Sequence, residues 1–150
     1  MIITSFSDHE YYNMFPMDFQ GHYPEPGIQL LGLKTSNITV NRIIDSRRVV
    51  VSSTDQIDSK TVYALGAHHS KEPPPINNLP FETCESEIFN FPVPGFSSSY
   101  RELEIVGHHI LGSHCMLVGH VINAKQRINS HSSFYQIHRF EYPGSGYRDI

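Results

Sequence analysis

A short polar stretch between two apolar segments contains the side chains best suited to bind a ligand. Its residues Lys34, Thr35, Ser36, Asn37 and Thr39 supply one cation, three hydroxyl groups and an amide. The stretch follows a strand-like run and precedes a helix-like spacing, so its backbone N–H groups would lie at a helix N-terminus. Such groups, with hydroxyls and a lysine nearby, suit a phosphate. The same residues would also serve as an ordinary helix-capping loop, with Ser36 or Asn37 as the cap.

Histidines and one cysteine gather further along the chain and raise the question of a metal site. They are His108, His109, His114, Cys115 and His120. Zinc requires three or four nitrogen or sulfur ligands that converge at about 2.0–2.3 Å. Neighbouring residues of a strand point to opposite faces, so His108 and His109 do not converge easily. The pattern disfavours a metal, and a histidine-rich, cupin-like metalloprotein is the weaker alternative.

The two cysteines, Cys84 and Cys115, show no CxxC or zinc-finger spacing. Two isolated cysteines favour reduced thiols in a cytoplasmic protein, although a disulfide between them stays open. Neither thiol has flanking basic residues that would activate it, and no G-x-S-x-G elbow surrounds a nucleophile. The sequence therefore does not predict a hydrolase.

The composition fits one globular domain of 150 residues, with 39% hydrophobic and 17% charged residues. The net charge is −4 and the basic residues are scattered, which argues against a nucleic-acid partner. The N-terminus lacks the pattern of a signal peptide, and no apolar run approaches the roughly 18 residues of a membrane span. We expect a cytoplasmic protein without a membrane partner.

The apolar spacing predicts short strands and two short helices, as in a small β-barrel with helical inserts. The expected strands are residues 2–6, 28–33, 48–53, 101–111, 115–124 and 134–142. One helix follows the polar stretch, with Val40, Ile43 and Ile44 on its buried face. The other begins near Asp55 and ends at Gly66.

The remaining segments are expected to be irregular. Residues 7–26 contain three prolines, which cannot donate ladder hydrogen bonds, and they read as a loop. Residues 67–98 read as a long loop with several phenylalanines. Residues 49–51 form a β-branched run typical of a strand covered on both sides. Residues 115–124 are apolar on both faces, as expected of a strand enclosed in a barrel.

Three motifs in the last third of the chain follow one another in a characteristic order. They read LEIVGHH (residues 103–109), LVGHV (117–121) and FYQIHRF (134–140). This order resembles the C-terminal signature of the flavin reductase-like, FMN-binding split-barrel family. Residues 27–52 are similar to a strand, a short helix and a second strand of that family. MFPMDFQG (14–21) is similar to the FPTDLHG element of one of its branches.

Two departures accompany the resemblance. The opening strands of the family are missing or reduced to residues 2–6. The family motif GDH reads Gly107-His108-His109 here, so His108 replaces the acid. We expect residues 1–150 to form a single flavin reductase-like domain with reduced or missing N-terminal strands.

The resemblance implies a mainly β split barrel of the FMN-binding type with two short helices. It implies FMN as the cofactor, NAD(P)H as a co-substrate, and a homodimer with the flavin at the interface. The protein would then be an oxidoreductase that reduces its flavin with NAD(P)H. The alternative is a relative that no longer catalyses and acts as a small-molecule binder or assembly partner.

The cofactor-binding residues predicted in this way are Lys34, Thr35, Ser36, Asn37, Thr39, His109, Tyr135 and Arg139. The polar stretch would hold the FMN phosphate. His109 could bond the flavin or the nicotinamide or relay a proton, or it could be a buried histidine satisfied by the backbone. Tyr135 and Arg139 could stack on or pair with the cofactor, or lie on an ordinary surface strand. No catalytic residue and no metal ligand is assigned.

Overall fold

The computed structural model describes residues 2–8, 11–17, 19–22, 25–54, 59–66 and 73–127. Within these ranges the chain is mainly β and contains two α-helices. Its elements are β1 (Ile2–Ser7), β2 (Tyr12–Pro16), β3 (Phe19–His22), β4 (Ile28–Lys34), α1 (Thr39–Ser46), β5 (Arg48–Ser53), α2 (Ser59–Leu65), the 3-10 helix η2 (Ile76–Asn78), β6 (Thr83–Glu85), β7 (Pro92–Pro94), β8 (Ser99–Leu111) and β9 (His114–Gln126).

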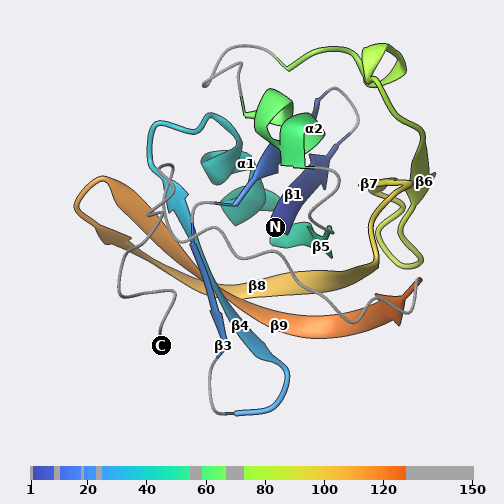
Figure 1. Ribbon diagram of the computed structural model, residues 1–150. Helices are drawn as coiled ribbons and strands as arrows, with labels where there is room; N and C mark the ends of the chain where they lie inside the picture. Colours follow the sequence, from blue (N-terminus) through green and yellow to red (C-terminus); the bar gives the residue numbers. More distant parts are fainter. Residues whose placement is uncertain are drawn as a thin grey trace, which may run out of the picture.

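Seven strands form one antiparallel sheet in the order β2-β1-β5-β8-β9-β4-β3, and β6 pairs with β7 in a separate ribbon. Strands β2 and β3 lie at opposite edges of the large sheet, yet only residues 17 and 18 separate them in the chain. Three virtual Cα–Cα bonds span at most about 11 Å. The sheet must therefore curl until its two edges approach each other. The long β8–β9 hairpin sweeps beneath the helices, and β3 and β4 cross it (Figure 1).

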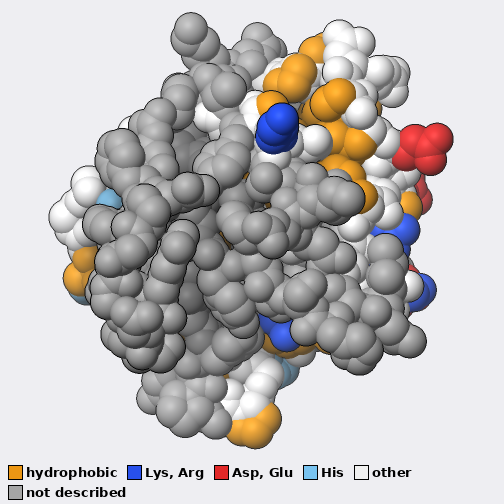
Figure 2. All heavy atoms as spheres, viewed as in Figure 1, with side chains coloured by type: hydrophobic (Ala, Val, Ile, Leu, Met, Phe, Trp, Pro, Cys, Tyr) orange, Lys and Arg blue, Asp and Glu red, His pale blue; other side chains and the backbone are white. Residues whose placement is uncertain are grey.

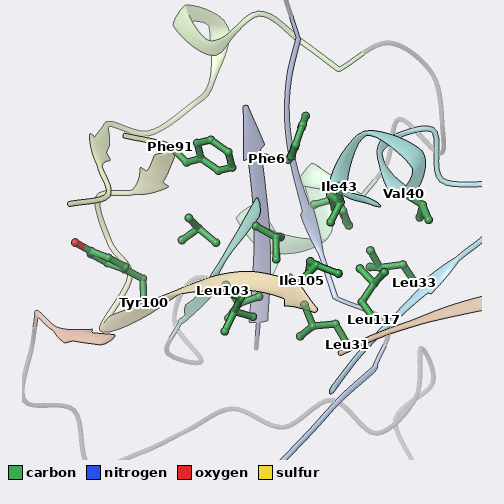
Figure 3. Close-up of a cluster of buried hydrophobic side chains, with 14 of the residues drawn as sticks. Phe6, Leu31, Leu33, Val40, Ile43, Phe91, Tyr100, Leu103, Ile105 and Leu117 are labelled. Carbon is green, nitrogen blue, oxygen red and sulfur yellow. The ribbon is translucent and has the colours of Figure 1, made fainter. Parts of the chain in front are cut away.

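The inside of the curl contains the main hydrophobic core. Leu31, Leu33, Leu103 and Leu117 are fully buried there, and α1 packs Val40 and Ile43 against them (Figure 3). Ile44, the third residue expected on this helical face, is partly buried against the same cluster. The apolar spacing of α1 therefore predicted its buried face correctly.

A second layer covers the outer face of the sheet at β1 and β2. Ile3 and Met14 point to this face and pack against Val62 and Leu65 of α2. Val49, Val50 and Val51 of the neighbouring β5 are all buried in the main core, as the β-branched run predicted. Hydrophobic side chains remain visible over the segment around η2, at the upper right of Figure 2.

The sequence prediction missed four strands in the segments expected to be loops. Strands β2 and β3 occupy part of residues 7–26, and β6 and β7 occupy part of residues 67–98. Among the described residues, each of the four has a hydrogen-bonded neighbour on one side only. Prolines are tolerated on such edge strands, because their missing N–H is not needed by a second neighbour. Pro16 of β2 and Pro92 and Pro94 of β7 lie on such edge strands, where the sequence predicts a loop.

Strand β9 also differs from its prediction. Cys115 and Leu117 are buried inside the curl, whereas Met116 and Val118 on the other face are only partly covered. The sheet is a half-barrel at this point, so β9 is enclosed on one face and not on both. The strand predicted at residues 134–142 lies outside the described residues. No helix in the described part of the chain is long and apolar enough to cross a membrane.

A buried carboxylate ties the segment after β6 to the sheet. Glu102 of β8 is 0% exposed and accepts hydrogen bonds from Phe89 N at 2.7 Å, Ile88 N at 3.0 Å and Asn123 Nδ2 at 2.7 Å. Burial alone would raise the pKa of this carboxyl, but its hydrogen bonds outweigh burial and hold the pKa below its ordinary value. Glu102 thereby anchors the turn of residues 86–91.

Replacing Glu102 by glutamine is expected to lower the free energy of unfolding by about 1.5–3 kcal/mol at pH 7, because an amide donor would face a backbone donor. The folded pKa lies below the unfolded value of about 4.3, so the carboxylate stabilises above that value. This stabilisation is lost as the pH falls through the folded pKa, and the difference between wild type and variant should shrink. Urea unfolding at pH 7 and pH 3 measures this difference in unfolding free energy. The variant Glu104→Gln, at an exposed position, is the control. Equal losses in both variants would contradict the anchor.

Candidate functional site

The predicted phosphate loop joins β4 to α1 and presents its polar side chains to solvent. Lys34, Thr35 and Ser36 are exposed, whereas Asn37 is partly buried. Ile38, directly before α1, already has helical backbone angles and its side chain makes no capping bond, whereas Asn37 Oδ1 accepts the N–H of Thr39 at 2.9 Å. The asparagine therefore caps the first turn from one residue earlier. The helix-capping interpretation is therefore correct for Asn37, and it leaves the side chains before it available to a ligand.

The backbone amides of this loop are divided between the fold and the solvent. Thr35 N donates to the carbonyl of Ser113 at 2.9 Å, and Asn37 N donates to Lys34 O at 2.9 Å. Within the described residues, no acceptor takes the N–H of Ser36 or Ile38. These two amides, together with the Lys34 ammonium and the Ser36 hydroxyl, form a compact set of anion donors.

Thr39 has a different role from the one predicted by the resemblance. Its side chain is 0% exposed, and its Oγ1 lies 2.9 Å from Tyr11 Oη and accepts a hydrogen bond from Asn13 Nδ2 at 2.8 Å. The hydroxyl is thus occupied inside the protein and fixes the start of α1 against the β1–β2 hairpin. We assign Thr39 to the support of the loop and not to its ligand-facing surface.

The turn of the β8–β9 hairpin completes the surroundings of the loop. The Ser113 carbonyl accepts hydrogen bonds from Thr35 N and from Thr35 Oγ1, and His114 is the direct partner of Lys34 across the β4–β9 pair. The sequence suggests Ser113 or His114 as the turn between two strands, and His114 as a possible metal ligand, but neither as a neighbour of the loop. Their position beside Lys34 follows from strand register, which the sequence pattern does not fix.

His109 lies on the same face of the sheet, further from the loop. It is exposed and pairs with Met116, and the row continues through Gly32 to Phe19. The alternative that His109 is a buried histidine is therefore wrong. From strand spacing and rise, its backbone lies about 12 Å from that of Lys34. A single small anion cannot contact both residues, but an elongated ligand could.

The structure thus brings Lys34, Thr35 and Ser36 together, with Asn37 and Thr39 behind them and His109 on the same face. Tyr135 and Arg139, the other predicted cofactor contacts, lie outside the described residues. Of the residues described, no three histidine, cysteine or acidic side chains are arranged to hold a metal ion. Cys84 and Cys115 are free thiols, and burial raises the pKa of Cys115. Neither forms part of this site.

Comparison with solved structures identifies the architecture. The FMN-binding protein from Thermus thermophilus superposes with a TM-score of 0.71 at 17% identity, over 83% of this chain and 70% of that one. The NADH:FAD oxidoreductase of Streptomyces globisporus C-1027 gives 0.73 at 16% identity, over 84% and 74%. Flavoredoxin from Methanosarcina acetivorans gives 0.70 at 14% identity, over 84% and 67%. No protein-family model and no curated protein sequence matches the chain.

The class defined by these likenesses is the split barrel of the flavin reductases and FMN-binding proteins. The chain has this fold, a mainly β half-barrel with two short helices, as its sequence motifs indicated. At this level of identity the comparison establishes the fold, and the ligand has to be argued from the residues of this chain.

Thr39→Val is expected to lower the free energy of unfolding by about 1–3 kcal/mol, because the Asn13 amide and the Tyr11 hydroxyl lose their buried partner. Thr39→Ser keeps the hydroxyl and should cost much less. Chemical denaturation of the two variants beside the wild type measures the difference. If valine is tolerated as well as serine, the hydroxyl does not hold α1 in place.

Proposed function

We propose that this protein binds FMN and catalyses its reduction by NAD(P)H. One observation carries the proposal: a split-barrel fold presents the Lys34 ammonium, the Ser36 hydroxyl and two amides with no acceptor among the described residues, all on the loop between β4 and α1. These donors match the chemistry of a phosphate monoester. We also propose that the protein is cytoplasmic, as the sequence predicts.

The donor set assigns a separate task to each residue of the loop. Lys34 supplies the charge, the Ser36 hydroxyl and the amides of Ser36 and Ile38 supply donors, and the Thr35 hydroxyl is donated to the Ser113 carbonyl and fixes the loop. Asn37 orients these amides by capping α1. The Ser113 carbonyl holds Thr35 in place and does not contact the anion itself.

His109 is proposed to contact the ring end of the cofactor. It is exposed on the face that also carries Lys34, and the separation of about 12 Å between their backbones requires an elongated ligand. The bound flavin would supply the redox chemistry, whereas the protein binds it, orients it and limits access of water. Tyr135 and Arg139 stay predicted contacts of the same cofactor.

We further propose a homodimer with the flavin at its interface. Pairing of β8 with β5 ends at Glu104, and in the described residues the continuation of β8 has no strand on that side. This free edge carries Val106 at 59%, Ile110 at 53% and Leu111 at 56% exposure. An apolar free edge favours pairing with another chain. The hairpin turn contacts Thr35, so a second copy bound here would lie beside the phosphate loop.

Lys34→Ala together with Thr35→Ala is expected to weaken FMN binding by about 1–3 kcal/mol, through loss of the charge-assisted hydrogen bond from Lys34 and of the Thr35 hydroxyl that fixes the loop to Ser113. Titration with FMN, followed by flavin fluorescence, measures the affinity. Lys60→Ala, an exposed lysine on α2, is the control for net charge. Unchanged affinity in the folded double variant would contradict the cradle.

Oxidation of NAD(P)H in the presence of FMN separates the reductase from a non-catalytic binder. The reductase predicts saturable turnover above the rate with free flavin. Saturable FMN binding without such turnover would favour a non-catalytic FMN binder, and no FMN binding by the folded protein would contradict both the reductase and the FMN binder.

Leu111→Glu is expected to convert the dimer into monomers and to weaken FMN binding, because it places a charge on the apolar β8 edge. Light scattering coupled to size-exclusion chromatography measures the mass, and Ile76→Glu on η2 provides an exposed control away from the edge. A monomeric wild-type protein, or a Leu111→Glu variant that stays dimeric, would contradict this interface.

A further inference from the structure

A groove lies at the opposite end of α1 from the phosphate loop. It consists of two depressions of about 280 Å³ and 420 Å³, which share Ser46, Arg48 and Phe89. Arg47, Glu104 and Ile122 complete the first depression, and Ser7, Asp8, Asn90 and Phe91 complete the second. We call it the arginine groove. Neither the resemblance nor the proposed flavin site makes use of it.

The guanidinium groups of the two arginines are available to a ligand. Both are exposed, and among the described residues neither guanidinium makes a hydrogen bond or an ion pair with a carboxylate. Arg48 and Glu104 are direct cross-strand partners, but the Arg48 guanidinium lies over the ring of Phe89, 5.4 Å from its centre. A guanidinium stacked in this way keeps the N–H groups on its edge available, and such a fork binds carboxylates and phosphates in bidentate fashion.

The backbone supports a functional role for this place. Arg47 and Asn90 are the two non-glycine residues with positive φ in the described part of the chain, at 57° and 56°, and both line the groove. Arg47 ends α1, a position that usually belongs to glycine or asparagine. An unfavourable backbone angle at a long cationic side chain is typical of sites where the side chain is needed for binding.

Hydrogen bonds within the protein already hold the wall of the groove that lies opposite α1. Ser86 N donates to Phe91 O at 2.9 Å and Ser86 Oγ accepts from Phe91 N at 3.1 Å, which closes the turn of residues 86–91. The Glu102 carboxylate accepts the backbone N–H of Phe89 and so holds this residue in place. Phe89 therefore presents a supported aromatic surface to the groove, and a ligand would not have to order this wall.

The charges of the groove favour an anion. Asp8 is paired with Arg42 at 2.8 Å, so its charge is balanced. Glu104 balances one of the two remaining guanidinium groups, which leaves one positive charge beside Phe89, Phe91 and Ile122. We propose that the arginine groove binds a small organic anion, in which a carboxylate or phosphate contacts Arg47 and Arg48 and a flat apolar body packs against Phe89.

Benzoate and phenyl phosphate are suitable probes, and benzamide is the neutral analogue. Titration of the ¹⁵N-labelled protein should give saturable shifts at the amides of Arg47, Arg48, Phe89 and Asn90 with at least one of the two anions. Benzamide should bind at least tenfold more weakly. The anion that binds more tightly shows whether the carboxylate or the phosphate is preferred.

Two substitutions test the assignment of the arginines. Arg48→Leu keeps an apolar side chain over Phe89 and should weaken anion binding tenfold or more. Arg47→Gly should also weaken binding, while it raises the midpoint of thermal unfolding, because glycine adopts the positive φ without strain. Lys60→Ala is the matched control and should leave binding unchanged.

Absence of saturable shifts in the folded wild type would overturn the proposal. Equal binding of benzamide, or undiminished binding by Arg48→Leu, would do the same. FMN titration of the groove variants should give the wild-type affinity, and benzoate titration of the Lys34→Ala, Thr35→Ala variant should also be unchanged. These experiments can therefore refute the arginine-groove proposal and the flavin-site proposal separately.

Discussion

The short connection between β2 and β3 is the constraint on which the remaining structure depends. Two strands at opposite edges of a seven-stranded sheet are joined through residues 17 and 18, so the sheet has to close on itself. Closure creates an inside that β4, β8 and β9 fill with leucines and that α1 covers. Gly32 lets the side chains of β3 and β9 pack closely over β4, because a Cβ there would meet Phe19 Cβ at 3.0 Å and Met116 Sδ at 3.2 Å. The position of both ends of α1 at the surface follows from this closure.

Helix α1 connects the core to the two candidate sites. Val40 and Ile43 fix its buried face, Thr39 fixes its beginning through Tyr11 and Asn13, and Arg47 ends it. The polar loop before the helix and the arginine groove after it are therefore held by the same packing. Neither site needs a dedicated scaffold, and both consist of side chains that the core leaves exposed.

The sequence predicted the parts of the fold that depend on local patterns. The buried face of α1, the enclosed run at Val49–Val51 and the loop at Lys34–Asn37 follow from spacing and capping chemistry, and the split-barrel motifs indicated the architecture. The edge strands were missed because a proline carries the same local signal in a loop and on a sheet edge. The contact of Ser113 with Thr35 and the burial of Glu102 depend on strand register and on a distant turn. No local pattern contains that information.

The net charge of −4 does not oppose local anion binding at either end of α1. At physiological ionic strength, interactions between exposed charges are screened over about 8 Å. An eight-residue helix is about 12 Å long, so Lys34 at one end contributes little field at Arg47 and Arg48 at the other. Each site must then bind through its own donors, and simultaneous occupancy involves little direct repulsion. A scattered charge distribution is thus compatible with two separate anion sites on one small domain.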